Sequence, residues 1–197
     1  AFIGIDVVVH LAAQIPDEPW QGMLDANVVG TYNVYEAARL AGVRRVIFAS
    51  SGDTIRGRER EHGLPYGAIA EGNYEEVPES WPMLTHEMIH PERIYGVSKV
   101  WGEALGRHFS DVYDISILCL RLGAVHVENR PMRVREFSTY LGHNDVVDIL
   151  HRCIEAPDDL KYDIFYANSN NKWGYRDMEH PRRILGFEPQ DSAEDFR

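Results

Sequence analysis

Two short apolar runs with a helical pattern between them constrain this chain most strongly. Residues 6–13 are apolar and rich in valine with almost no polar alternation, which is typical of a strand covered on both faces. Over residues 25–41, apolar and small side chains recur at helical spacing, and Gly42 follows as a helix stop. Residues 43–51 form the second apolar run. A strand, a helix and a strand in this order predict a βαβ unit with parallel strands.

The alternation of strands and helices resumes after a long interruption. Residues 52–93 are rich in Gly, Pro and acidic residues, and we interpret them as a loop-rich insertion or lid with one short helix. Beyond it lie two helical and two strand patterns, over residues 95–109, 144–156, 115–120 and 164–167. The sequence therefore predicts one α/β domain over residues 1–197 with a doubly wound, Rossmann-like parallel sheet. The insertion belongs at the C-terminal rim of the strands, where such sheets bind ligands.

The charge and the cysteine content limit the cellular environments and the binding partners that we expect for this protein. The chain has 20 Lys and Arg against 31 Asp and Glu, and the net charge of -11 disfavours nucleic acid and anionic membranes as partners. No apolar run has the length of about 18 residues that a membrane helix needs, and no secretory signal opens the sequence. Cys119 and Cys153 form no C-x-x-C motif, so we expect two reduced, buried thiols in a cytoplasmic protein.

Tyr95 and Lys99 carry the clearest chemical signal. They lie four residues apart on a predicted helix and therefore share a face. A neighbouring cation favours tyrosinate, so we expect Lys99, with any bound cationic cofactor, to lower the pKa of Tyr95 toward neutrality. Tyr95 is then a general base or acid. The preceding strand ends in Ser50 and Ser51, and we expect the Ser51 hydroxyl to bind a substrate hydroxyl or carbonyl while Tyr95 moves the proton.

Four sequence blocks in this order resemble the extended short-chain dehydrogenases/reductases of the NAD-dependent epimerase/dehydratase family. The blocks are residues 9–13, 27–31, 46–51 and 95–99. The resemblance implies an enzyme in which Tyr95 is the catalytic base, Lys99 also holds the nicotinamide ribose and Ser51 orients the substrate. It further implies that Asn27 supports the active-site helix. The implied contacts to the cofactor, NAD or NADP, come from Leu11, Ala12, Ala13, Asn27, Ser50, Tyr95, Lys99 and Leu122.

The family's glycine-rich first turn and its ribose-selecting acid have no counterpart before Asp6. The first residue is Ala1 rather than Met. We therefore expect the chain to be the C-terminal portion of an extended family member, without the N-terminal βαβ portion.

Within the family, the C-terminal third is similar to uronate dehydrogenases, which oxidise hexuronic acids at C1 with NAD. The similar stretches are residues 121–123, 138–141, 168–173 and 185–194. In those enzymes an arginine upstream of a Ser-Thr block clamps the substrate carboxylate, and a guanidinium suits that role because its fork is bidentate. Counting forward from residues 121–123 selects Arg133, and counting back from Ser138 selects Arg135. Both remain candidates.

Other expected substrate contacts are Ser51 and Gly52. This chain departs from the uronate dehydrogenases at three substrate positions, where Ile15 and Ala124 replace serines and Gly52 replaces an asparagine. The insertion between Ser51 and Tyr95 is also longer than theirs. These departures affect polar contacts to the substrate and leave the redox residues unchanged.

The leading hypothesis is an NAD(P)-dependent oxidoreductase that acts on a sugar or sugar acid through Ser51, Tyr95 and Lys99. The alternative is an NAD-dependent sugar-nucleotide epimerase or dehydratase that uses the same residues and returns the hydride to its substrate. A third hypothesis is a non-catalytic dinucleotide sensor. The resemblance also implies a homodimer formed through the helices predicted over residues 25–41 and 95–109.

Residues 86–90 spell H-E-x-x-H, a zinc-protease motif that requires a helix carrying both histidines on one face. Pro82 and Pro91 bracket it, and Pro91 favours an extended conformation at His90. We therefore predict a loop and no metal at this motif.

Overall fold

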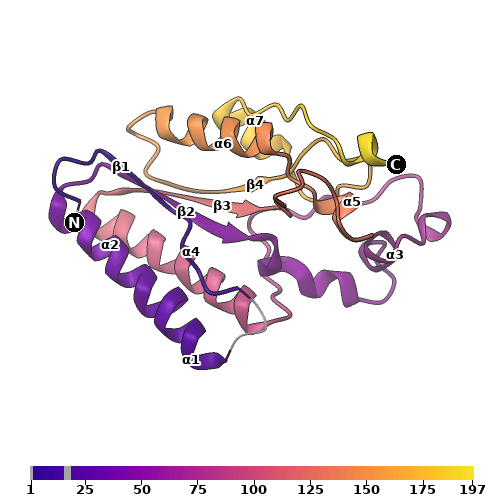
Figure 1. The fold of residues 1–197 in the computed structure, drawn as a ribbon, viewed down its shortest axis with the longest axis horizontal. Coiled ribbons are helices and arrows are strands. Elements are labelled where there is room, and N and C mark those ends of the chain that lie inside the picture. The colour runs from indigo at the N-terminus through magenta and orange to yellow at the C-terminus, as the bar shows by residue number, and fades with distance from the viewer. Residues whose placement is uncertain (1, 16–18) are drawn as a thin grey trace.

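A four-stranded parallel sheet organises the molecule (Figure 1). The computed structural model describes residues 2–15 and 19–197. The strands are β1 (Val7–His10), β2 (Arg45–Ser51), β3 (Ser116–Leu122) and β4 (Tyr162–Ala167), and they lie in the sheet in chain order. β2 and β3 pair from Arg45 opposite Ser116 to Ser51 opposite Leu122, so both strands end at the same edge. The predicted parallel α/β sheet is confirmed.

Helices cover both faces of this sheet, as a doubly wound fold requires (Figure 1). Helices α2 and α4 lie against one face, and α6 and α7 lie against the other. α2 ends at Gly42, which takes the left-handed conformation at φ 72° that favours glycine. The helices are α1 (Trp20–Met23), α2 (Gly30–Ala41), α3 (Tyr66–Glu71), α4 (Ile94–Tyr113), α5 (Glu136–Thr139), α6 (His143–Glu155) and α7 (Glu179–Leu185), with a π-helical stretch Leu24–Val29 between α1 and α2 and a closing 3₁₀ turn Ala193–Phe196.

Two apolar clusters fill the space between the sheet and its helices. One lies under α2 and α4 and includes Tyr35, Phe48 and Phe109. The other lies under α6 and α7 and includes Leu118 and Phe165. Alternate side chains of each strand supply the two clusters, which explains why the strand patterns are apolar throughout. Both cysteines are buried and unpaired, as predicted.

The insertion after β2 contains more helix than predicted. It begins with a 3₁₀ segment, Gly52–Arg60, and continues with α3 and a second 3₁₀ turn, Tyr74–Glu76. The one short helix that the sequence predicts corresponds to α3, whereas the two 3₁₀ segments were not predicted. The Ser51 hydroxyl accepts from the Asp53 amide and caps the first 3₁₀ segment. A third apolar cluster joins the insertion to the sheet, with Ile55, Tyr66, Ile69 and Leu84 from the insertion, Tyr166 from β4 and Tyr175 from the loop after β4.

No helix in residues 2–15 and 19–197 is both long and apolar enough to cross a membrane.

Candidate active site

A cavity of about 420 Å³ lies at the C-terminal ends of β2 and β3. β2 contributes Ser51, the start of α4 contributes Tyr95, and β3 contributes Leu122. The position is the one that parallel α/β sheets use for ligands. Its lining brings together five of the predicted site residues, namely Ser51, Gly52, Tyr95, Leu122 and Arg135.

Burial, rather than Lys99, dominates the protonation of Tyr95. Burial of the phenol raises the pKa of Tyr95, and the Asp53 carboxylate raises it further, while a hydrogen bond with Ser51 and the Arg93 charge oppose them. The expectation that Lys99 lowers this pKa toward neutrality is not met in the structure. The Lys99 Nζ atom lies 5.5 Å from the centre of the Tyr95 ring and donates a hydrogen bond of 2.8 Å to the Ala49 carbonyl.

Lys99 is a buried ammonium with hydrogen-bonding capacity to spare. Its side chain lies beneath Tyr95 and between α4 and β2, and the residue is only 3% exposed. Burial lowers the pKa of Lys99 to about 8, although the Glu103 carboxylate raises it. An ammonium has three donors, and the Ala49 carbonyl takes one of them. Lys99 can therefore still bind hydroxyl oxygens of a ligand.

Asn27 links two segments that border the site. The side-chain NH₂ group of Asn27 donates to the Gln14 backbone carbonyl at 2.9 Å and to the Ser98 hydroxyl at 3.1 Å. Its side-chain oxygen accepts from the Gln14 backbone amide at 2.7 Å. The segment that follows β1, with Leu11, Ala12 and Ala13, is thereby anchored to α4. Asn27 lies in the π-helical stretch, a feature often found at functional sites.

Ser50 points away from the cavity. Successive strand residues face opposite sides of a sheet, so Ser51 faces the site and Ser50 faces the core. The Ser50 hydroxyl donates to Glu103 at 2.5 Å, and Glu103 forms a bidentate buried ion pair with Arg121 at 2.8 and 2.9 Å. The Ser50 hydroxyl therefore does not face the cavity, and the cofactor contact expected of Ser50 stays a prediction. The Arg121 guanidinium also donates to the Met88 carbonyl at 2.9 Å, which fixes the end of the insertion.

The two candidate arginines occupy different environments. Arg133 is exposed and does not line the cavity, whereas Arg135 lines it. Arg135 is already paired, because its Nε donates to the Glu59 carboxylate at 2.7 Å. Burial alone raises the pKa of Glu59, but Arg135 and the Tyr175 hydroxyl, which donates at 2.6 Å, lower it overall. Both partners are therefore ionised and bound to each other.

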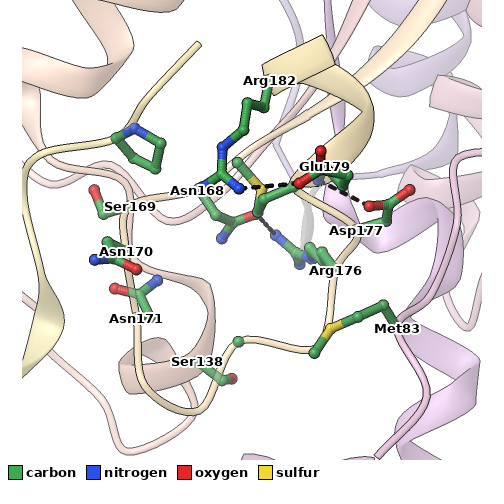
Figure 2. A pocket seen from close by; sticks show the side chains of 13 residues that line it. Met83, Ser138, Asn168, Ser169, Asn170, Asn171, Arg176, Asp177, Glu179 and Arg182 are labelled. Carbon is green, nitrogen blue, oxygen red and sulfur yellow. Dashed lines mark hydrogen bonds and ion pairs between the residues drawn. The ribbon is translucent and has the colours of Figure 1, made fainter. Parts of the chain in front are cut away.

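Sequence reasoning missed four charged residues of the cavity, Asp53, Arg93, Glu136 and Arg176. The Nε of Arg93 donates to Asp53 at 3.0 Å, and this contact joins the two ends of the insertion. Arg176 enters from the loop after β4. A second cavity, of about 240 Å³, adjoins the same arginine, and Figure 2 shows Arg176 beside Asn168 and Asp177 in its wall. No local sequence pattern indicated Arg176, although the missing side chain of Gly52 leaves room for its guanidinium beside Ser51.

The H-E-x-x-H motif forms a turn followed by irregular backbone, so it is a loop as predicted. Its two histidines contact different residues. The Nδ1 atom of His90 lies 2.8 Å from the Glu61 carboxylate. His86 stacks on His180 with ring centres 4.0 Å apart, and His180 pairs with Asp163 at 2.9 Å. His86, Asp163 and His180 offer ligand atoms within 4.8 Å of one another. The two rings are nearly parallel, at 20°, so their in-plane lone pairs do not converge on one metal ion.

A parallel α/β sheet with helices on both faces and a cavity at the C-terminal ends of its strands defines a Rossmann-like domain. The sequence profile of the NAD-dependent epimerase/dehydratase family matches residues 1–141. The chain belongs to this family, and the resemblance to extended short-chain dehydrogenases/reductases is confirmed.

Individual relatives extend the similarity over the whole chain. An NAD-dependent glucose-6-phosphate dehydrogenase of Haloferax volcanii is 32% identical over 100% of this chain and 72% of its own length. A uronate dehydrogenase of Agrobacterium fabrum is 33% identical over 98% of this chain and 64% of its own length. A point mutant of the Agrobacterium tumefaciens uronate dehydrogenase, solved with NAD, superimposes with a TM-score of 0.80 at 31% identity, covering 99% of this chain and 65% of the other. The chain thus spans slightly less than two thirds of the uronate dehydrogenases.

Proposed function

We propose that the protein catalyses the NAD-dependent oxidation of a hydroxyl group on a sugar or sugar acid. The observation that carries this proposal is the grouping of Ser51 and Tyr95 on the wall of one cavity with Lys99 directly beneath Tyr95. The relatives that are dehydrogenases of sugars and uronates support the same reaction class.

The residues around Lys99 fit a nicotinamide dinucleotide. NAD, when bound, supplies a nicotinamide ring that accepts a hydride from the substrate carbon. The two unused donors of Lys99 suit ribose hydroxyls. Leu122 and the segment of Leu11 to Ala13, which Asn27 anchors, lie at the strand ends where a dinucleotide binds.

Proton transfer falls to the side chains on the cavity wall. The Ser51 hydroxyl holds the reacting hydroxyl, and the Tyr95 phenolate accepts its proton. Burial and Asp53 raise the pKa of Tyr95, so the reactive phenolate becomes more populated as the pH rises. The rate of oxidation should therefore increase from neutral to alkaline pH.

NADH formation tests the proposal directly. The complete reading frame that encodes this chain is incubated with NAD and a panel of hexuronic acids and neutral aldoses, and absorbance of NADH is followed. Tyr95→Phe should reduce turnover by about 10²- to 10⁴-fold, because it removes the proton acceptor. Tyr113→Phe, at the exposed end of α4, is the matched control and should retain activity. Epimerised sugar nucleotide without net NADH would instead establish the epimerase alternative.

We also propose that the protein is a homodimer that pairs through α2 and α4. These helices lie side by side and carry exposed apolar side chains, among them Val29 and Val97 (Figure 1).

A further inference from the structure

Arg176 is a buried guanidinium that no carboxylate of the described residues pairs with. It is 5% exposed, and Nη1 donates to the Asn168 oxygen at 3.0 Å, as Figure 2 shows. The Nε atom has no hydrogen-bond partner, and within residues 2–15 and 19–197 no carboxylate forms an ion pair with this side chain. Burial lowers the pKa of Arg176 and the Arg135 charge lowers it further, while Tyr175, Tyr166 and the Glu59 carboxylate raise it. A buried cation in this state is stabilised by any anion that reaches it.

The other deeply buried arginines are fully partnered. Arg45 is on β2, and its guanidinium reaches the C-terminal end of α6. There it donates to the carbonyls of Cys153 at 2.9 Å and Ala156 at 2.7 Å. Arg121 is paired with Glu103. Both residues therefore serve the fold, whereas Arg176 keeps part of its donor capacity free.

The Arg176 guanidinium is positioned beside the proposed catalytic serine by Gly52. A Cβ atom added at Gly52 would lie 1.9 Å from Nη2 and 2.3 Å from Cζ of Arg176. The guanidinium thus occupies the space that a side chain at position 52 would fill, directly after Ser51. Any larger residue at position 52 would displace Arg176 from the cavity wall.

The acidic groups around the cavity are already bound to other partners. Asp53 is paired with Arg93. Glu136 accepts from the backbone amides of Met132 at 2.6 Å and Arg133 at 3.0 Å. Glu59 is held by Arg135 and the Tyr175 hydroxyl. Among the described residues, Arg176 is therefore a cation of the cavity wall that no carboxylate pairs with.

We propose that Arg176 binds an anionic group on the substrate, and that it selects an acidic sugar over a neutral one. The inference rests on the proposed function and names the substrate class of that same cavity. A planar guanidinium fork matches two oxygens of a carboxylate or a phosphate. Arg176 takes this role in place of Arg133, which is exposed, and Arg135, which is bound to Glu59.

Ligand-dependent thermal unfolding tests the proposal independently of turnover. The complete protein is melted in saturating NAD with galacturonate, glucose 6-phosphate or galactose as the probe. We expect at least one anionic sugar to raise Tm and galactose to have a smaller effect. Comparison of galacturonate with glucose 6-phosphate distinguishes the carboxylate from the phosphate. In Arg176→Gln the shift from the anionic sugar should disappear, whereas Arg107→Gln, on the exposed face of α4, should keep it.

The unliganded variants separate binding from a structural role. Because Arg176 is buried and no carboxylate of the described residues pairs with it, Arg176→Gln without sugar should melt at the wild-type temperature or higher. A lower Tm for Arg176→Gln together with an unchanged response to the anionic sugar would overturn the inference. Equal responses of the wild type to galactose and to both anionic sugars would overturn it as well.

Steady-state kinetics complete the test and separate this inference from the proposed reaction. Arg176→Gln should raise KM for the acidic sugar by on the order of 100-fold with a smaller change in kcat. The KM of Arg176→Lys should lie between that of Arg176→Gln and that of the wild type. An Arg176-dependent Tm shift without NADH formation would support anion binding and refute the proposed oxidation. Oxidation with the same KM in wild type and Arg176→Gln would support the reaction and refute the role of Arg176.

Discussion

Burial sets the protonation of the titratable residues that surround Lys99. The Lys99 ammonium has its pKa lowered to about 8, and the neighbouring His10 has its pKa lowered to about 4 by burial and by the Lys99 charge. Tyr95 responds in the opposite direction, because burial disfavours its anionic form. One physical cause therefore keeps His10 and Tyr95 neutral near pH 7, and Lys99 is the cation among the three.

The pH dependence of stability should report on His10. Its pKa falls from an ordinary value of 6.5 to about 4 on folding, so below pH 6.5 the unfolded chain binds a proton that the folded chain refuses. The free energy of unfolding should therefore decrease between pH 6.5 and 4, by up to about 3 kcal/mol from this residue. Urea unfolding of wild type and His10→Gln across this range measures the difference. Identical pH profiles for the two proteins would contradict the assignment.

At the scale of elements, α4 is held against the sheet and the insertion by glycines. A Cβ atom at Gly96 would lie 2.5 Å from the Asp53 carbonyl oxygen, and one at Gly102 would lie 2.4 Å from the Phe48 ring. Gly96 follows Tyr95, so its lack of a side chain lets the insertion approach the start of α4. The glycine in the Tyr95–Lys99 motif is therefore explained by packing.

Gly96→Ala should separate α4 from the 3₁₀ segment Gly52–Arg60. The added methyl group meets backbone atoms, which cannot rotate away, so we expect a loss of about 1 to 3 kcal/mol in the free energy of unfolding. The displacement should also reduce NADH formation, because Tyr95 and Ser51 lie on the two separated elements. Gly22→Ala in α1 is the control, since its nearest contact would be an ordinary 3.9 Å. Equal stability of the two variants would refute this account of the packing.

The regular elements were predictable from sequence, whereas the insertion and its charges were not. Apolar runs and helix stops such as Gly42 depend on local chemistry, and they predicted the sheet and the helices on both faces. The helix predicted over 25–41 nevertheless begins earlier, at Trp20, because a π-helical stretch continues α1 into α2. The positions of Arg93 and Arg176 depend on long-range pairing across the insertion and β4. No local pattern encodes such contacts.

Over the whole molecule, the two helical layers differ in the apolar side chains that they leave exposed to solvent. α2 and α4 lie together on one face of the sheet (Figure 1), where Val29, the residue before α2, is 46% exposed and Val97 on α4 is 47% exposed. Val147 on α6, across the sheet, is 65% exposed but isolated on a polar helix. Grouped apolar side chains mark interaction surfaces, whereas scattered ones are normal.

The proposed homodimer should therefore depend on the α2 and α4 face alone. A stable interface needs about 1,000 Å² of buried surface, so placing charges within it should be disruptive. We expect the wild-type protein to have the mass of a dimer in light scattering, and Val29→Glu combined with Val97→Glu to have the mass of a monomer. Val147→Glu should remain a dimer because its side chain lies across the sheet from this face. A monomeric wild-type protein, or a dimer that survives both glutamates, would exclude pairing through these helices.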